Sequence, residues 1–165
     1  MKWKALICSL LLTLGAGGFA AVLTADSMEK YQDMYHPPLA PPGWVFPFVW
    51  TLLYILMAIS AYLVYTARPK EQTQELDEKP ESKNKVLKLY LLQLAVNVIW
   101  PVLFFRFDLY LVSAVWIIGL WYLIFLTAEN FYKIRPIAGK LLVPYFIWVT
   151  FAVYLNIFIA VYTWS

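Results

Sequence analysis

The chain has 165 residues, a formal net charge of +3 and a mean hydropathy of +0.66. Hydrophobic residues make up 62% of it and charged residues 14%, whereas a soluble domain has about 45–50% apolar and about 25% charged residues. This composition excludes an ordinary water-soluble fold and predicts one all-α domain with the lipid bilayer as its solvent.

Five apolar runs are long enough to cross the hydrocarbon core, which takes ~20 residues of helix. Backbone groups in lipid must satisfy each other, so we expect helices and not isolated strands. The expected bundle of five transmembrane helices covers residues 5–25, 44–67, 86–105, 109–131 and 139–162. The first run can also be interpreted as a signal peptide cleaved after Ala25, although it is long for that role. The small residues Gly15–Gly18 in this run favour close helix packing over a ligand role.

The connections differ in character. Residues 36–43 are rich in proline, which restricts the backbone and predicts a stiff loop. Residues 68–85 are polar and charged, which is typical of a flexible, solvated loop. We expect Arg106–Asp108 to form a tight turn.

The basic residues predict an orientation. Of the 13 Lys and Arg, only Lys30 and Arg106 fall on the side of the first and third connections. The others fall on the side of the N-terminus. The positive-inside rule then places the N-terminus in the cytoplasm and the C-terminus outside. The basic residues form no stripe of the kind that binds nucleic acid, so we expect no nucleic-acid partner.

Few residues suit catalysis or metal binding. The single histidine, His36, and the single cysteine, Cys8, cannot build a His- or Cys-based metal site. The apolar runs carry no charged residue near their centres, which argues against ion-coupled transport. An apolar, aromatic ligand is therefore the favoured partner.

Polar and aromatic residues inside three runs are candidates for lining a ligand site. Phe46, Trp50 and Tyr54 are spaced by four and form one stripe on the second expected helix. Gln93, Asn97 and Trp100 share a face of the third, where they predict either interhelical hydrogen bonds or a polar handle in an aromatic pocket. We expect Pro101 to kink this helix or to free a carbonyl.

The fifth expected helix carries a similar group. Trp148, Ala152 and Asn156 share a face, and a small residue one turn from a tryptophan leaves a slot beside the indole ring. Simple helix packing at Ala152 is the alternative interpretation.

Three long motifs resemble the TspO/MBR family. One is Pro41-Pro42-Gly43-Trp44-Val45-Phe46 continued by Trp50, Leu53 and Tyr54. The second is Gln93-Leu94 with Asn97, Trp100 and Phe104-Phe105. The third is Leu141-Leu142-Val143-Pro144-Tyr145 with Trp148, Phe151-Ala152 and Leu155-Asn156.

The resemblance implies a five-helix bundle, often a homodimer, in a bacterial cell membrane. It implies a cavity capped by the first loop that binds a tetrapyrrole, namely protoporphyrin IX or haem, with no obligatory cofactor. Sterols and benzodiazepine-site compounds are further ligands in the family. By position, the implied ligand-binding residues are Tyr31, Pro41, Phe46, Trp50, Tyr54, Asn97, Trp100, Trp148 and Ala152.

The function that follows is that of a receptor, sensor or carrier. One alternative is an enzyme-like, light-dependent breakdown of porphyrin, for which the resemblance implies Trp50 and Trp148. Others are transport of a sterol or lipid-type ligand and a scaffold with an empty cavity. The chain departs from the family pattern at Lys30-Tyr31 and His36-Pro37, and at Pro47-Phe48. It also ends without the basic residue of a C-terminal cholesterol motif, so sterol binding is disfavoured.

Overall fold

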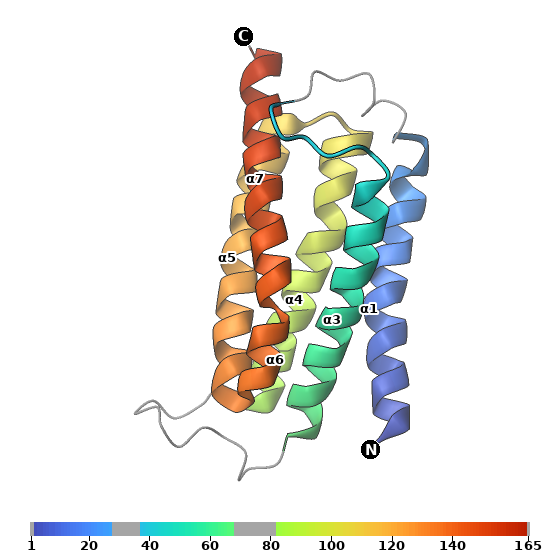
Figure 1. The fold of residues 1–165 in the computed structure, drawn as a ribbon, viewed down its shortest axis with the longest axis vertical. Helices are drawn as coiled ribbons and strands as arrows, with labels where there is room; N and C mark the ends of the chain where they lie inside the picture. The colour runs from blue at the N-terminus through green and yellow to red at the C-terminus, as the bar shows by residue number, and fades with distance from the viewer. Residues whose placement is uncertain (1, 28–36, 68–81, 165) are drawn as a thin grey trace.

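The computed structural model describes residues 2–27, 37–67 and 82–164, and every long element in these ranges is a helix. Five stretches are long and apolar enough to cross a membrane, which confirms the predicted fold class. Figure 1 shows the helices running alternately up and down, with the two ends of the chain at opposite ends of the bundle. The long helices are α1 (Trp3–Thr24), α3 (Val45–Thr66), α4 (Lys83–Pro101), α5 (Tyr110–Ile134) and α7 (Val143–Trp164).

The observed start of α4 differs from the sequence-based expectation. We expected the charged loop to run through residue 85, but α4 already begins at Lys83. The Ser82 hydroxyl accepts a hydrogen bond from the Lys85 backbone N–H at 3.4 Å. This is the usual role of serine at a helix N-cap, and it shortens the connection. The rest of the expected loop, residues 68–81, lies outside the described residues.

The fifth span is made of two helices and also begins earlier than expected. The short helix α6 (Pro136–Leu141) precedes α7, and its first residue is a proline. Proline suits the first turn of a helix because its missing N–H would have had no partner there. The same reasoning explains Pro144 in the first turn of α7.

The helical pattern of α4 changes at Pro101, as its sequence predicted. The following segment η3 (Val102–Arg106) is a π-helix, and the Phe107 N–H donates to the Val102 carbonyl at 3.1 Å. Proline cannot donate to the carbonyl one turn earlier, so the regular pattern ends there. The chain then turns through Asp108, whose φ of 55° lies in the left-handed region.

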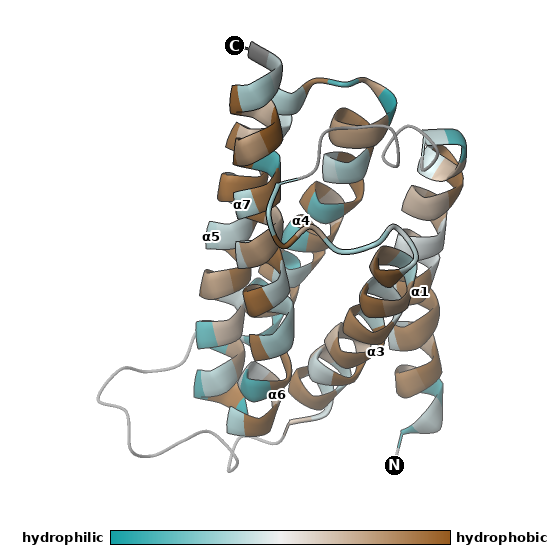
Figure 2. Cartoon of the chain, turned by 45° about the horizontal axis from the view of Figure 1, so that its top comes forward, coloured by the Kyte–Doolittle hydropathy of each residue, from teal (hydrophilic) through white to brown (hydrophobic). Residues whose placement is uncertain are grey.

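Large apolar side chains cover the outside of the bundle. Leu11, Val22, Val115 and Val161 are each at least 65% exposed. Figure 2 shows hydrophobic residues along most of α1 and α3. Exposing so much apolar surface to water would be unfavourable, whereas contact with lipid chains carries no such cost. The protein is therefore an integral membrane protein.

The bundle has a definite order of neighbours. The helix α1 packs against α3 and α4, and α5 packs between α4 and α7. Residues 37–44 cross the end of the bundle nearest the C-terminus (Figure 1). The Tyr154 hydroxyl of α7 donates to the Pro38 carbonyl at 3.1 Å and ties this segment, the crossing loop, to the bundle.

Hydrogen bonds between helices fix this arrangement. At the opposite end from the crossing loop, the Ser9 hydroxyl donates to the Ala58 carbonyl at 2.7 Å. One turn further along α1, the hydroxyls of Thr13 and Tyr90 are 2.7 Å apart. Such bonds are favoured in lipid because no water competes for the groups.

Candidate functional site

The aromatic stripe of α3 lines a cavity near the end covered by the crossing loop. Phe46, Trp50 and Tyr54 form one wall, and Asn97 and Trp100 of α4 form the next. The cavity has a volume of about 150 Å³ and a mainly apolar lining. Five of the residues predicted for the site are thus brought together by α3 and α4.

The third wall comes from α1, which the sequence analysis did not include in the site. Its members are small: Gly17, Ala20, Ala21 and Thr24. Gly17 lies against the Tyr54 ring so closely that a Cβ atom would collide with it. The predicted close packing is therefore found at Gly17, whereas Gly15 and Gly18 face open space. The run of small residues was the signal, since such residues let another helix approach.

The rings around Trp50 form a continuous aromatic cluster. The Trp50 ring centre lies 5.7 Å from that of Tyr54 and 6.3 Å from that of Trp100, with tilted planes. On its α7 side, Trp50 meets the Tyr145 ring edge-on at 6.1 Å. These separations are within the range of favourable aromatic pairs. Three rings of the cluster, those of Trp50, Tyr54 and Trp100, line the cavity.

Asn97 provides the one amide among the described residues of the cavity wall. Its Nδ2 donates to the Tyr54 hydroxyl at 3.3 Å, and its side chain is buried. Its Oδ1 has no hydrogen-bond partner among the described residues. A buried acceptor without a donor is costly, so this atom favours a bound donor.

Gln93, one turn earlier on α4, serves as an interhelical link. The Tyr145 hydroxyl of α7 donates to Gln93 Oε1 at 3.1 Å. Both interpretations of the α4 amides therefore have support in the structure: Gln93 and Asn97 join helices, and Asn97 also keeps an unused acceptor beside the cavity.

The two predicted residues of α7 do not line this cavity. The Trp148 ring packs against Phe46, with ring centres 5.9 Å apart, so Phe46 separates it from the cavity. Ala152 faces a void of only about 10 Å³ between α3, α4 and α7. Next to this void, the Trp100 Nε1 donates to Asn156 Oδ1 at 2.9 Å.

The remaining predicted residues lie in the first loop. Pro41 belongs to the crossing loop and is half-buried. Tyr31 and His36 lie outside the described residues. No group of three or more His, Cys, Asp or Glu able to hold a metal occurs in the part of the chain that the structure describes.

The chemistry of the cavity suits binding better than catalysis. Its lining offers aromatic faces, one amide and the hydroxyls of Tyr54 and Thr24. The lining contains neither an acid–base pair nor an activated nucleophile. Pockets for drug-sized ligands usually measure about 300–1,000 Å³. This cavity, at about 150 Å³, is smaller than that.

Comparisons with known proteins agree on one family. The family model described as "TspO/MBR family" matches residues 8–162. The "Tryptophan-rich sensory protein" of Cereibacter sphaeroides is 32% identical over 94% of this chain and 89% of its own length. The "Tryptophan-rich protein TspO" of Chlorobaculum tepidum is 34% identical over 92% and 90%. The human "Translocator protein" is 32% identical over 79% and 73%.

Proposed function

Because the chain belongs to the TspO/MBR family, we propose that it is a membrane receptor or carrier for a tetrapyrrole such as protoporphyrin IX or haem. The observation that carries the proposal is the cavity wall of Trp50, Tyr54 and Trp100. Flat rings at these separations offer stacking surfaces to a flat macrocycle. Asn97 Oδ1 adds one acceptor for a ring N–H or a protonated side-chain group.

The cavity must expand to accept such a ligand. The helix α1 lines its side, and the crossing loop passes over the same end of the bundle. The helix α1 is the least buried of the five spans, and beside the cavity it accepts an exposed hydrogen bond from the Arg106 guanidinium at the Leu23 carbonyl, at 3.1 Å. Segments with few buried contacts are the ones that open at low free-energy cost. We therefore assign the opening to α1 and the crossing loop.

The residues that line the cavity determine how haem would be held. Among the residues that the structure describes, they include no His, Cys or Met, which are common axial ligands of haem iron. The Tyr54 hydroxyl is engaged with Asn97. We therefore propose that packing against the rings, and not iron ligation, holds the macrocycle.

A porphyrin titration with matched aromatic variants tests the proposal. Trp50 lines the cavity, whereas Phe48 on the same helix is 68% exposed and does not line it. With purified protein in lipid nanodiscs, Trp50→Ala should weaken protoporphyrin IX binding by about tenfold or more. Phe48→Ala should leave the affinity unchanged. Equal affinities for the wild type and both variants would reject this cavity as the site.

We place the N-terminus in the cytoplasm and the C-terminus outside. The described ends of α4, α5 and α6 that lie near the N-terminus carry Lys83, Lys88, Lys133 and Lys140, in line with the positive-inside rule. A C-terminal alkaline phosphatase fusion should be active and a C-terminal green fluorescent protein fusion dark in a bacterial cell. The reverse pattern would overturn this orientation.

The homodimer also belongs to the proposal. Ile7, Leu11 and Val22 form an exposed apolar stripe on α1 that a second copy would cover. Mass measurement of the protein in nanodiscs should give two copies per particle at excess lipid. One copy per particle would reject the dimer and would leave the proposal of tetrapyrrole binding unaffected.

A further inference from the structure

A second and larger cavity lies at the end of the bundle that holds the N-terminus. It has a volume of about 960 Å³ and is bounded by the first half of α1, the last turns of α3 and the first turns of α4. Leu12, Ala61, Leu87 and Leu91 give it an apolar floor and walls. We call it the N-terminal groove. It shares no lining residue with the cavity around Trp50.

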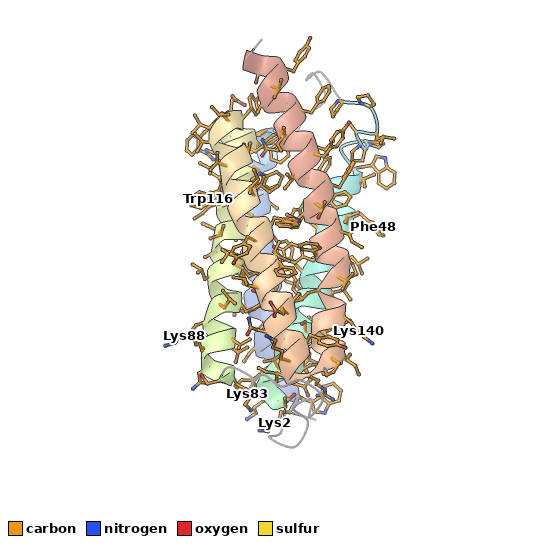
Figure 3. The ribbon with its side chains drawn as sticks, turned by 90° about the vertical axis from the view of Figure 1, so that its left-hand side faces the viewer. Lys2, Phe48, Lys83, Lys88, Trp116 and Lys140 are labelled. Carbon is orange, nitrogen blue, oxygen red and sulfur yellow. The ribbon has the colours of Figure 1, made fainter. Side chains whose placement is uncertain are left out.

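The mouth of the groove is basic and aromatic. Lys2 and Lys4 line it together with Trp3, Tyr62 and Tyr65. Tryptophan and tyrosine gather at the level of lipid headgroups, and lysine reaches the same level. Figure 3 shows Lys2, Lys83, Lys88 and Lys140 at this one end of the bundle.

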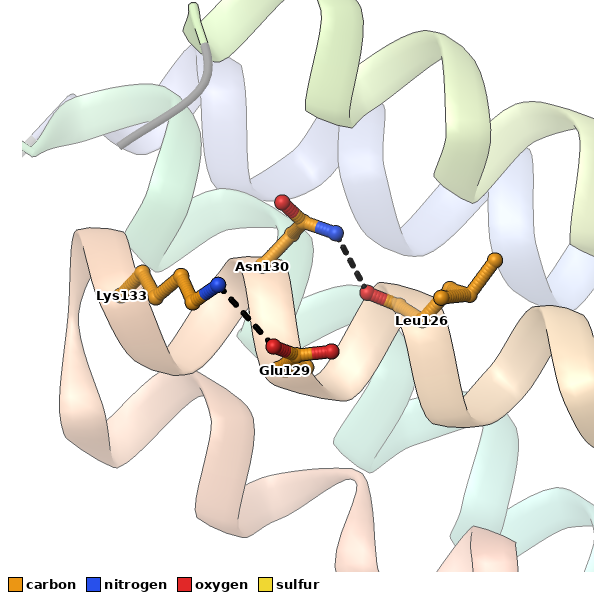
Figure 4. A network of polar contacts seen from close by, with 4 residues as sticks. All are labelled: Leu126, Glu129, Asn130 and Lys133. Atoms are coloured by element: carbon orange, nitrogen blue, oxygen red, sulfur yellow. Dashed lines mark hydrogen bonds and ion pairs between the residues drawn. The ribbon is translucent and has the colours of Figure 1, made fainter. Parts of the chain in front are cut away.

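The described residues around this mouth carry little negative charge. None of the described residues that line the groove is a carboxylate. Of the acidic residues described, Asp26 and Asp108 are near the opposite end, and Glu129 forms an ion pair with Lys133 at 2.9 Å (Figure 4). The described part of this end thus complements an anion.

The length of the groove matches one leaflet of a bilayer. Its lining on α1 runs from Lys2 to Leu12, which is about 15 Å of helix. Half of the hydrocarbon core is also about 15 Å thick. A molecule with its headgroup at the lysines would therefore reach the bilayer centre with its chains.

We propose that the N-terminal groove binds an anionic phospholipid from the leaflet at the N-terminal end. The phosphate lies beside Lys2 and Lys4, and an acyl chain lies along Leu12, Leu87 and Leu91. Basic pockets between transmembrane helices recognise anionic lipid headgroups by this combination of charge and apolar surface. The inference concerns a separate site and does not depend on tetrapyrrole binding.

Native mass spectrometry with defined lipids tests the proposal. The full chain is stripped of lipid in detergent and incubated with equal amounts of dioleoyl phosphatidylglycerol and dioleoyl phosphatidylcholine. The wild type should retain phosphatidylglycerol with a preference on the order of tenfold, from two lysines at the headgroup. The double variant Lys2→Gln/Lys4→Gln should lose that preference.

Two matched controls separate this site from general effects. Lys88→Gln/Lys140→Gln removes the same charge at the same end but outside the groove, and it should keep the preference. Leu12→Trp fills the groove and should reduce retention of both lipids. Val115→Trp adds the same ring at an exposed position of α5 that does not line the groove, and it should leave retention unchanged. Thermal unfolding in detergent checks that each variant is folded. If a double lysine variant does not fold, the corresponding single lysine variants are measured in its place.

Three outcomes would overturn the proposal. One is that the wild type shows no preference for phosphatidylglycerol. Another is that Lys2→Gln/Lys4→Gln and Lys88→Gln/Lys140→Gln lose this preference to the same extent. The third is a change of copy number in Leu12→Trp with lipid retention intact, which would make the groove an interface between copies. Porphyrin titration of the same samples reports on the other cavity, so either proposal can fail alone.

Discussion

Gly17 of α1 lies against the ring of Tyr54 on α3, with no room for a side chain between them. The ring is held from two other sides, because its hydroxyl accepts a hydrogen bond from Asn97 and its face packs against Trp50. The absence of a side chain at position 17 therefore sets the distance between α1 and α3 beside the cavity.

The first prediction concerns this contact. Gly17→Val should lower the free energy of unfolding by about 1–3 kcal/mol, because α1 must move outward or the Tyr54 ring must leave Asn97. Thermal unfolding of the purified protein in mild detergent measures the change. Gly18→Val is the control, since position 18 faces open space. Equal losses in both variants would show that the contact with Tyr54 is not responsible.

The second prediction concerns Asn156, which joins three helices. It accepts from Trp100 Nε1 of α4 at 2.9 Å and donates to the Tyr110 carbonyl of α5 at 3.0 Å. Asn156→Leu leaves the buried Trp100 Nε1 without an acceptor and removes one bond to the Tyr110 carbonyl, which still accepts from the Ser113 hydroxyl at 2.9 Å. It should cost about 1–3 kcal/mol of stability.

Asn130 provides the matched control for Asn156. Its amide donates at 2.8 Å to the Leu126 carbonyl within its own helix (Figure 4), so Asn130→Leu breaks no link between helices. Thermal unfolding of the two leucine variants should separate them clearly. A loss in Asn130→Leu as large as that in Asn156→Leu would contradict a special role for the three-helix link.

The third prediction concerns the crossing loop. Tyr154→Phe removes the hydrogen bond to the Pro38 carbonyl and frees one attachment of the loop to α7. Protoporphyrin IX should then associate and dissociate faster, by similar factors, in stopped-flow fluorescence. Tyr122→Phe alters an exposed tyrosine of α5 outside the cavity and should change neither rate. Unchanged rates in Tyr154→Phe would mean that the loop does not gate the site.

The fourth prediction compares ligands with and without iron. If ring packing holds the macrocycle, protoporphyrin IX and haem should bind with affinities within about tenfold of each other. Bound haem should also show no spectrum of side-chain ligation to iron. A much tighter haem complex that Tyr54→Phe weakens would instead indicate a tyrosine ligand.

The fifth prediction concerns the light-dependent alternative. Trp50 lines the cavity, whereas Phe46 stands between the cavity and Trp148. Any light-dependent loss of the porphyrin absorption band beyond that of free dye should therefore fall more in Trp50→Phe than in Trp148→Phe. Identical loss in both variants and in free dye would reject an enzyme-like role.

Much of the fold could be predicted because hydrophobic length alone decides which segments cross a bilayer. The exact helix ends depend on single residues whose capping effect is not reflected in their hydropathy. Ser82 starts α4 three residues before the apolar run, and Pro136 starts α6 within a polar turn. Both are capping effects, which act through backbone hydrogen bonds and not through burial.

The candidate site was predictable on two of its walls. Spacing by three or four placed Phe46, Trp50 and Tyr54 on one face and Asn97 and Trp100 on another, and both faces meet at the cavity. Spacing within a helix does not reveal which helix comes next to it. The contribution of α1 and the position of Trp148 behind Phe46 depend on packing between segments far apart in the chain. Ligand binding at these residues stays a prediction.

The side-chain hydrogen bonds of α1 make its two ends unequal. Ser9 and Thr13 fasten its first half to α3 and α4 through buried or partly buried groups. Beside the cavity, the corresponding bond is an exposed one, from the Arg106 guanidinium to the Leu23 carbonyl at 3.1 Å. If α1 moves as a rigid body, its first turns should therefore act as the pivot. The largest displacement should then occur at its C-terminal half, which lines the aromatic cavity.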